Sequence, residues 1–426
     1  MASRSWIDAL LAPEGQRLLE ELSRTTITAG NEISLITRLR RDHSPELVAA
    51  AIEQTKLRRR ARRKLPAADR MYFTAPALEQ ASSSLAARHR AHRFAAFDRV
   101  ADLCCGVGSD AIALAERSRV VAVDNDAVHA RLAALNAAAN DVGDRVEVVC
   151  SDVRSVDLRG VSAAFVDPAR RSGDRRFAAG MSEPPLSWCV ELADRLAIGI
   201  KAAPGLPVTL VPPAWELEFV SESGELKEAV LWSPQLATVR EDLVGTAGAR
   251  RATLLSNNET LIGPTGASVP VRPPGRYLLD PDPAVTRAGL VEDLGSSLGS
   301  SPGSSLAASF GASAGPSSNE CWKIDDRVAF LSADSAFQTP FARTLRIEAS
   351  MPWSLARVRD ALRALDVGVV DIRKRGSAVD VDELHARLKL RGTRTATVVL
   401  TRVADRPWAF ICFEILRKGV VDAQGI

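Results

Sequence analysis

The chain has 426 residues, of which 46% are hydrophobic and 25% charged, and this composition excludes a fibrous, collagen-like or wholly disordered polypeptide. At roughly 150 residues per domain, the length predicts two or three domains. Fifty-five Lys and Arg against 52 Asp and Glu leave a net charge of +3, which as an average over the chain predicts no acidic partner. The sequence has no apolar run near ~20 residues and no secretory hydrophobic stretch at the N-terminus, so we expect no membrane partner and a cytoplasmic location.

Residues 5 to 64 are predicted to be helical. Ser44, Pro45 and Glu46 supply an N-cap, a proline at the first helical position and an acid in the first turn. The helix that starts there ends in a basic run, residues 56 to 70, with eight Lys or Arg against Asp69 alone. Such a run has the charge to neutralise several RNA phosphates, and the alternative is an exposed helix face. The candidate RNA contacts in this run are Arg58, Arg59, Arg62 and Arg63.

From about residue 98, short β-branched runs alternate with Ala- and Leu-rich stretches, which predicts a parallel sheet covered by helices. The strand-like runs are 99–103, 120–123, 146–149, 163–166 and 197–201. Two more runs, 215–220 and 226–232, have no helix between them. They predict an antiparallel hairpin at the edge of the sheet.

The C-terminal third begins with a biased segment. Residues 294–318 contain 15 Gly or Ser in 25 positions and no charge, so we expect a flexible tether there. The chain from 322 onward then predicts a compact α/β module in the order strand, helix, strand, helix, strand, strand. Between Arg373 and Arg406 this module holds nine Lys or Arg against four acids, a second local excess of positive charge.

The strongest motif is the stretch VADLCCGVGSDA, residues 100–111, in which an apolar strand leads through a glycine turn into a helix. Glycines let the backbone approach a ligand closely, and a helix N-terminus adds unpaired N–H groups. The turn also fits the GxGxxA pattern of dinucleotide sites, so by itself it leaves both interpretations open.

Acidic residues at the strand ends decide between the two interpretations. Asp102 lies four residues before Gly106, where its carboxylate can bind an ammonium but would repel a pyrophosphate. Asp124 ends the second strand, where it can accept bonds from both hydroxyls of a ribose. Asp152 and Asp167 follow the next two strands, so four consecutive strands end in acids at the edge where open α/β sheets bind ligands.

The stretches DLCCGVGSDAIALA, AVDNDAVHARLAALNAA, VEVVCSDV and VDPAR resemble successive motifs of the class I S-adenosylmethionine (SAM) methyltransferases. Asn136 and Gly143 are similar to residues of RNA methyltransferases of the trimethylguanosine-synthase type. The layout around this domain resembles that of bacterial methyltransferases with a THUMP-like C-terminal domain. The resemblance therefore implies a Rossmann-like α/β fold between a helical N-terminal domain and a small THUMP-like α/β module.

The resemblance also assigns cofactor roles. It implies that Asp102, Gly106 and Gly108 hold the methionine end of SAM and Asp124 the ribose. Asp152 and the Val153 backbone would hold the adenine, and the segment before the first strand would close over the cofactor. The candidate cofactor-binding residues are Phe73, Thr74, Asp102, Cys104, Gly106, Gly108, Asp124, Asn125, Asp152 and Val153.

The candidate reaction centre is Asp167-Pro168-Ala169-Arg170-Arg171. Amino-group methyltransferases carry Asp or Asn, Pro, Pro and an aromatic residue here, and the carboxylate and a proline carbonyl accept the hydrogens of the target amine. Here Ala169 and Arg170 replace the second proline and the aromatic residue. The catalytic candidates are Asp167 and Pro168, and the substrate-binding candidates are Arg170, Arg171 and Lys201. For Lys201, at the end of the fifth strand, a surface lysine is the alternative.

We therefore predict domains at 1–70, 71–258 and 259–426, and methylation of a nitrogen in a tRNA or rRNA base by direct displacement. Two alternatives remain open: a methyltransferase for a protein or small anionic metabolite, and a non-catalytic protein that binds SAM and RNA. The six cysteines form no CxxC pair, and none lies near a histidine at zinc-ligand spacing, so we expect no metal. The sequence does not predict an oligomeric state.

Overall fold

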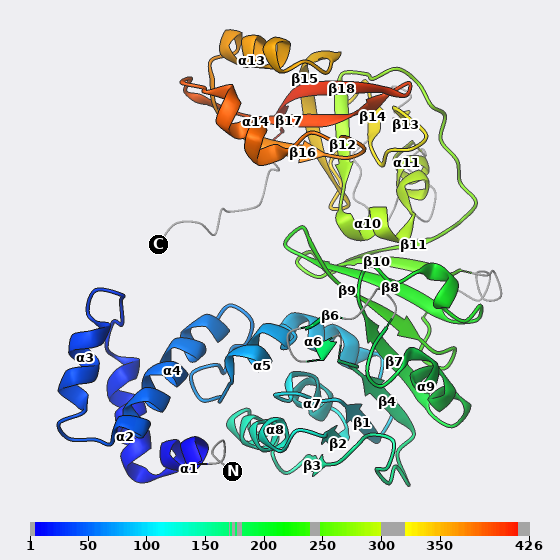
Figure 1. Cartoon of the computed structure of the whole chain (residues 1–426). Helices are drawn as coiled ribbons and strands as arrows, with labels where there is room; N and C mark the ends of the chain where they lie inside the picture. Colours follow the sequence, from blue (N-terminus) through cyan, green and yellow to red (C-terminus); the bar gives the residue numbers. More distant parts are fainter. Residues whose placement is uncertain are drawn as a thin grey trace. The chain divides into compact units, whose positions relative to one another are not determined.

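The computed structural model describes residues 5–169, 171–172, 175–176, 181–238, 248–299 and 320–415 (Figure 1). The chain divides into two compact units. The first comprises Met1–Trp215 and Val230–Thr238, and the second Glu216–Ala229 and Val239–Ile426. The predicted three-domain division at 70 and 258 stays a prediction.

The N-terminal region is helical, as predicted. Its helices are α1 (Ser5–Leu11), α2 (Pro13–Ser23), α3 (Glu32–Leu39) and α4 (Pro45–Ala61). Ser44 caps α4, because its Oγ accepts a hydrogen bond from the Leu47 N–H at 3.2 Å. One apolar cluster joins residues of α1, α2 and α4 to Val107 and to Leu132. The helices therefore share a core with the glycine turn.

Two short helices, α5 (Ala75–Gln80) and α6 (Ser84–His92), lead from the helical region into the sheet. Five parallel strands follow in the order β3-β2-β1-β4-β7. They are β1 (Arg99–Leu103), β2 (Arg119–Asp124), β3 (Val146–Cys150), β4 (Ala163–Val166) and β7 (Ala197–Ala202). All five predicted strands are confirmed.

Helices α7 (Ser109–Ala115) and α8 (Ala127–Ala139) lie side by side against β2 (Figure 1). The remaining short elements of this region are β5 (Arg171–Ser172), β6 (Arg175–Arg176), α9 (Leu186–Glu191), η2 (Leu192–Asp194) and η3 (Val208–Leu210). Gly199 has a structural reason in β7: a Cβ there would lie 2.6 Å from the Trp232 ring.

The predicted hairpin exists as β8 (Glu216–Glu222) and β9 (Glu225–Trp232), but its predicted place at the sheet edge is wrong. Two strands that we did not predict, β10 (Arg250–Leu254) and β11 (Glu259–Gly263), extend the sheet beyond it. β10 pairs in parallel with β8 and antiparallel with β11. The sheet therefore has nine strands in mixed orientation and ends at β11.

The second unit contains a seven-stranded sheet in the order β13-β14-β12-β15-β18-β17-β16. Its strands are β12 (Tyr277–Pro281), β13 (Trp322–Lys323), β14 (Leu331–Ala333), β15 (Ala342–Pro352), β16 (Val367–Lys374), β17 (Arg394–Val403) and β18 (Arg406–Glu414). Helices α13 (Leu355–Ala364) and α14 (Val381–Leu388) share an apolar core with this sheet. The predicted order of the α/β module is confirmed from β15 to β18.

The predicted flexible tether is wrong for its first six residues. Helix α11 (Val291–Gly299), which follows α10 (Pro283–Ala288), includes them, and the side chains of Leu294 and Leu298 are buried. Leucines four residues apart lie on one helical face, and this apolar pair outweighs the Gly and Ser around it. The tether's other residues, 300–318, lie outside the described residues. None of the described helices combines the length and hydropathy needed to cross a membrane.

Candidate functional site

The glycine turn lies between β1 and α7. Gly106 and Gly108 have φ of +55° and +84°, and Cys104 before them has φ of +65°. A Cβ added at Gly106 would meet no atom within 4 Å, so this position faces open space. Burial raises the pKa of the Cys104 thiol, with smaller contributions from Asp124 and Asp167. The backbone thus leaves room for a ligand and the thiol stays protonated.

Asp102 is the buried acid of this turn. It lies near the end of β1 and is 1% exposed, and neither carboxylate oxygen has a hydrogen-bond partner within the described residues. Burial, then Asp110 and Asp167, raise the pKa of Asp102 well above its ordinary value, and the nearby Ala111 N–H and Arg90 offset this only in part. A buried carboxyl without a partner is costly, which fits a group that binds a cation from a ligand.

Asp124 fixes the turn from the end of β2. Its two oxygens accept the N–H groups of Gly106 and Asp126, each at 2.9 Å. His129 Nδ1 lies 3.6 Å from Asp124 Oδ1, and the interaction with this carboxylate raises the pKa of His129. Asn125, beside Asp124, is exposed. The carboxylate therefore holds the turn and keeps lone pairs that can accept ribose hydroxyls.

The segment before β1 is tied to the turn by Asn136 of α8. The Asn136 side chain accepts the Tyr72 N–H at 2.7 Å and donates to the Tyr72 and Val107 carbonyls, each at 3.0 Å. Phe73 is 1% exposed and packs into a core cluster, while Thr74 caps α5. The segment thus lies beside the turn as predicted, but the Phe73 side chain faces the core.

The third strand ends as predicted in an exposed acid. Asp152 Oδ1 accepts the Arg154 N–H at 2.8 Å, and Val153 beside it is buried. The first four strands are parallel neighbours, so Asp102, Asp124, Asp152 and Asp167 all belong to the carboxyl edge of the sheet. The predicted edge of acids is confirmed.

The reaction-centre candidates follow β4. Asp167 is 27% exposed at its side chain, and Pro168 is buried. Ala169 pairs with Glu183: its N–H donates to the Glu183 carbonyl at 2.8 Å, and its own carbonyl accepts at 2.9 Å. A proline at 169 would lack this donor. Arg170 lies outside the described residues, and of Arg171 only the β5 backbone is described.

Lys201 at the end of β7 is a buried lysine and not a surface one. It is 7% exposed, and its Nζ lies 2.7 Å from Asp167 Oδ2 and 3.2 Å from Ser82 Oγ. Ser82 Oγ in turn donates to Asp110 Oδ2 at 3.1 Å and accepts from Arg90 at 2.6 Å. We did not predict this network behind Asp167.

The basic run is largely bonded within the protein. Arg58 donates to the Met71 carbonyl at 2.9 Å and stacks over the Tyr72 ring, and Arg59 donates to the Leu22 carbonyl. Carboxylates pair with Lys56, Arg60, Arg62 and Arg70. Arg62 and Arg63 are exposed. Arg58 and Arg59 are thus half-buried and bonded to backbone carbonyls, and the RNA contact predicted for this run stays a prediction.

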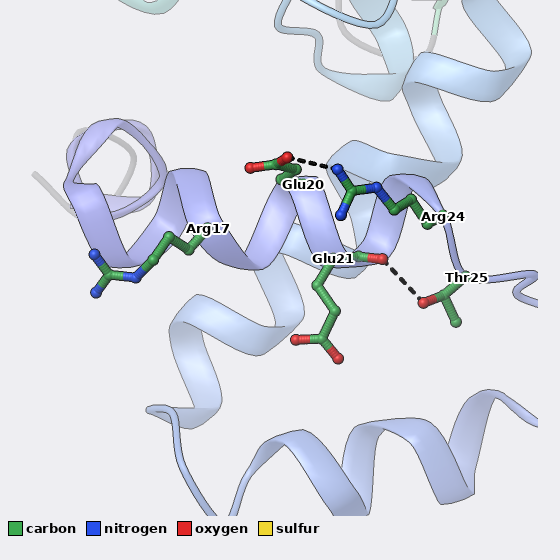
Figure 2. Close-up of a pocket in the computed structure, with 5 residues that line it drawn as sticks. All are labelled: Arg17, Glu20, Glu21, Arg24 and Thr25. Atoms are coloured by element: carbon green, nitrogen blue, oxygen red, sulfur yellow. Dashed lines mark hydrogen bonds and ion pairs between the residues drawn. The ribbon is translucent and has the colours of Figure 1, made fainter.

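A hollow of about 400 Å³ lies on α2. Figure 2 shows its lining, in which Arg24 pairs with Glu20 at 2.7 Å and Thr25 donates to the Glu21 carbonyl at 3.0 Å. These contacts are local to the helix and the hollow contains none of the predicted site residues. Within the described ranges, no group of three His, Cys, Asp or Glu side chains could hold a metal ion.

Comparison with known proteins agrees with this geometry. A methyltransferase-domain model matches residues 100–166, a THUMP domain-like model matches 342–414, and a model of a domain of unknown function matches 4–61. Two curated proteins of Mycobacterium tuberculosis, strains CDC 1551 and H37Rv, are 34% identical over 386 residues, or 87% of this chain and 97% of each relative. Each is called an uncharacterized S-adenosylmethionine-dependent methyltransferase.

The chain belongs to the S-adenosylmethionine-dependent methyltransferases. This methyltransferase carries a THUMP-like C-terminal domain. A crystal structure from Porphyromonas gingivalis W83, named as a methyltransferase, shares its fold with a TM-score of 0.69 at 21% identity, covering 92% of this chain and 100% of that one.

The methyltransferase's own residues fit SAM. The unpartnered Asp102 carboxyl suits the ammonium of the methionine moiety, and the open space at Gly106 suits a ligand that lies against the backbone. Asp124 suits the ribose. SAM is therefore the cofactor that the site and the family both indicate.

Proposed function

We propose that this methyltransferase methylates a nitrogen of a tRNA or rRNA base. The observation that carries the proposal is the position of Asp167: a partly exposed carboxylate, held by a lysine, at the sheet edge that carries Asp102 and Asp124. A carboxylate there can accept an N–H of an amine and so orient the nitrogen lone pair, which is catalysis by positioning and electrostatics.

Each group has a defined role in this proposal. SAM, when bound, supplies a methyl group activated by the positive sulfonium. Asp167 accepts one hydrogen of the acceptor nitrogen through Oδ1, since Oδ2 already binds Lys201. The Pro168 carbonyl accepts a second hydrogen, and Arg170 and Arg171 contact the acceptor's phosphate.

An RNA acceptor is supported by the THUMP-like module. Arg363, Lys389 and Arg391 are exposed there and line a hollow of about 510 Å³ together with Asp366. The side chains of these three cations have no hydrogen bond or ion pair with another described residue, so their charge is available to phosphates. Such a cluster contacts the backbone of a nucleic acid and carries no base specificity.

The test compares modified nucleosides in tRNA and rRNA from a strain that lacks the protein and from its parent, by mass spectrometry. We expect one methylated nucleoside to disappear in the deletion strain. It should return with the wild-type protein and not with Asp167→Ala. A complete set of unchanged nucleosides would overturn the RNA proposal.

A further inference from the structure

The polar network behind Asp167 reaches the cofactor side of the site. Asp110 lies in the first turn of α7, directly after the glycine turn, and it is one of the two acids that raise the pKa of Asp102. Arg90 binds Asp110 at 2.7 Å, is 1% exposed, and lies 5.1 Å from the Phe165 ring of β4. The network thus connects α7, which follows the glycine turn, to β4, the strand that precedes Asp167.

We infer that Lys201, Ser82 and Arg90 are positioning residues for methyl transfer, which fix Asp167 and join it to the first turn of α7. This inference rests on the proposed role of Asp167. It replaces the sequence-based prediction that Lys201 binds substrate phosphate, because a lysine that is 7% exposed and already donates to two groups is poorly placed to meet one.

Lys201 sets which oxygen of Asp167 is available. A buried ammonium needs a partner, and the 2.7 Å contact with Oδ2 of Asp167 supplies one. The other oxygen then remains for the acceptor nitrogen. The side chain of Asp167 is 27% exposed, so a substrate can reach it. The contact between Oδ2 and Lys201 meanwhile restricts its side-chain torsions.

Ser82 joins the two ion pairs. Its hydroxyl accepts from Arg90 and from Lys201 and donates to Asp110, which uses its one hydrogen and both lone pairs. A hydroxyl with all its hydrogen bonds made has one orientation. A movement of the Lys201–Asp167 pair should therefore move the Arg90–Asp110 pair as well, and the reverse. The position of Asp167 is therefore coupled to that of Asp110.

The test measures methyl transfer from tritiated SAM into an extract of the deletion strain, fractionated into RNA, protein and small molecules. The single variants are Lys201→Met, Lys201→Arg and Asp167→Asn. The double variant combines Asp167→Asn with Lys201→Met. Lys323→Met is the matched control, because Lys323 is also a shielded lysine, 13% exposed, that pairs with Glu292 at 2.8 Å. Calorimetry gives the Kd for SAM of each variant.

We expect Lys201→Met to lower kcat by roughly 100-fold, as for a misplaced catalytic group, with the Kd for SAM nearly unchanged. Lys201→Arg should recover part of kcat, and Lys323→Met should leave it unchanged. In the Asp167→Asn background, Lys201→Met should change kcat by no more than about twofold, because a pair that acts as one unit is not additive.

Two results would overturn the inference: a wild-type kcat in Lys201→Met, or fully additive losses in the double variant. Label in a fraction other than RNA contradicts the proposed acceptor, and the Lys201 comparison is then made in that fraction. If the wild-type protein labels no fraction, the test is urea unfolding. It compares the unfolding midpoints of the wild type, Lys201→Met, Asp167→Asn and the double variant. Additive shifts of the midpoint would reject the coupling of Lys201 to Asp167.

Discussion

At the scale of single residues, the site depends on the ionisation of Asp102. The pKa of Asp102 is raised by burial and by two neighbouring acids, and a bound ammonium favours the charged form. A proton therefore leaves Asp102 when SAM binds to the protonated form. It follows that the Kd for SAM falls as the pH rises through this pKa, by at most about tenfold per pH unit. Near pH ~8 the ammonium of SAM itself loses its proton, and the fall in Kd ends there.

Calorimetry between pH 5.5 and 7.5, in buffers of differing ionisation enthalpy, measures both the affinity and the proton release. Asp102→Asn should weaken SAM binding by roughly 30-fold or more at the upper end of this range, the cost of losing one partner of a buried charge pair. It should also remove the proton release. An Asp102→Asn variant that binds SAM as tightly as the wild-type protein would contradict the ammonium role of Asp102.

Asp167 should have the opposite profile. Asp167→Ala removes the acceptor for the substrate amine and leaves Asp102, Asp124 and the glycine turn in place. We expect methyl transfer to be abolished and SAM binding not to weaken, since Asp167 is one of the acids that raise the pKa of Asp102. Transfer assays and calorimetry on the same preparation measure both quantities, and an equal loss of both would remove Asp167 from the reaction centre.

At the scale of elements, Asn136 determines how the segment before β1 meets the glycine turn. Asn136 is fully buried and makes three side-chain hydrogen bonds, so Asn136→Ala leaves buried polar groups of two elements unpaired. We expect a loss of about 3 kcal/mol in the free energy of unfolding. SAM binding should weaken as well, since the turn loses its support.

Urea unfolding measures this effect, and Asn140→Ala is the matched control. Asn140 lies one helical turn further along, is less buried, and donates one side-chain bond, to the Asn136 carbonyl at 2.8 Å. Its removal should cost no more than about 1 kcal/mol. Similar losses in the two variants would show that Asn136 has no special role.

The elements also show which patterns in a sequence are informative. The five parallel strands are apolar, short and separated by helical stretches, so this pattern predicts a parallel α/β sheet without an alternative. β10 was missed because it begins with two arginines, and β14 because it has three residues. Whether β8 and β9 lie at an edge depends on β10, a partner that is distant in the sequence.

The site was predictable where one residue type implied one chemistry. The acids at four strand ends are of this kind. Three other residues of the site could not be predicted: Arg90, Ser82 and Asp110. Each stands in a sequence context that is typical of a surface residue: a basic helix, a run of serines and the start of a helix. Only the fold brings them together within 3.2 Å.

At the scale of the whole molecule, charge that is clustered in the sequence is not equally available in space. Glu32, Glu79 and Asp141, all outside residues 56–70, pair with cations of that run. The sequence count of one acid against eight cations therefore overstates the charge open to RNA. The cations around the hollow of the THUMP-like module are not paired with acids of the described residues, so their charge remains open to RNA.

The triple variant Arg363→Gln, Lys389→Gln, Arg391→Gln should therefore bind bulk tRNA more weakly. The slope of log Kd against log salt concentration should fall by about 2 to 3, since each phosphate that is no longer neutralised lowers it by about one unit. Filter binding between 50 and 200 mM salt measures both effects.

The control removes the same charge at Arg38, Arg272 and Arg387, which are exposed but paired with glutamates. If both triple variants lower the slope equally, the effect belongs to net charge and the hollow does not bind RNA.

The pairing of Ala169 with Glu183 has a consequence for redesign of the reaction centre. A proline at 169 would remove one of the two hydrogen bonds that hold residue 183 against the reaction centre. Ala169→Pro would therefore weaken the attachment of the segment around Glu183 to the reaction centre. The residue type after Pro168 thus affects how a segment further along the chain, at Glu183, is held.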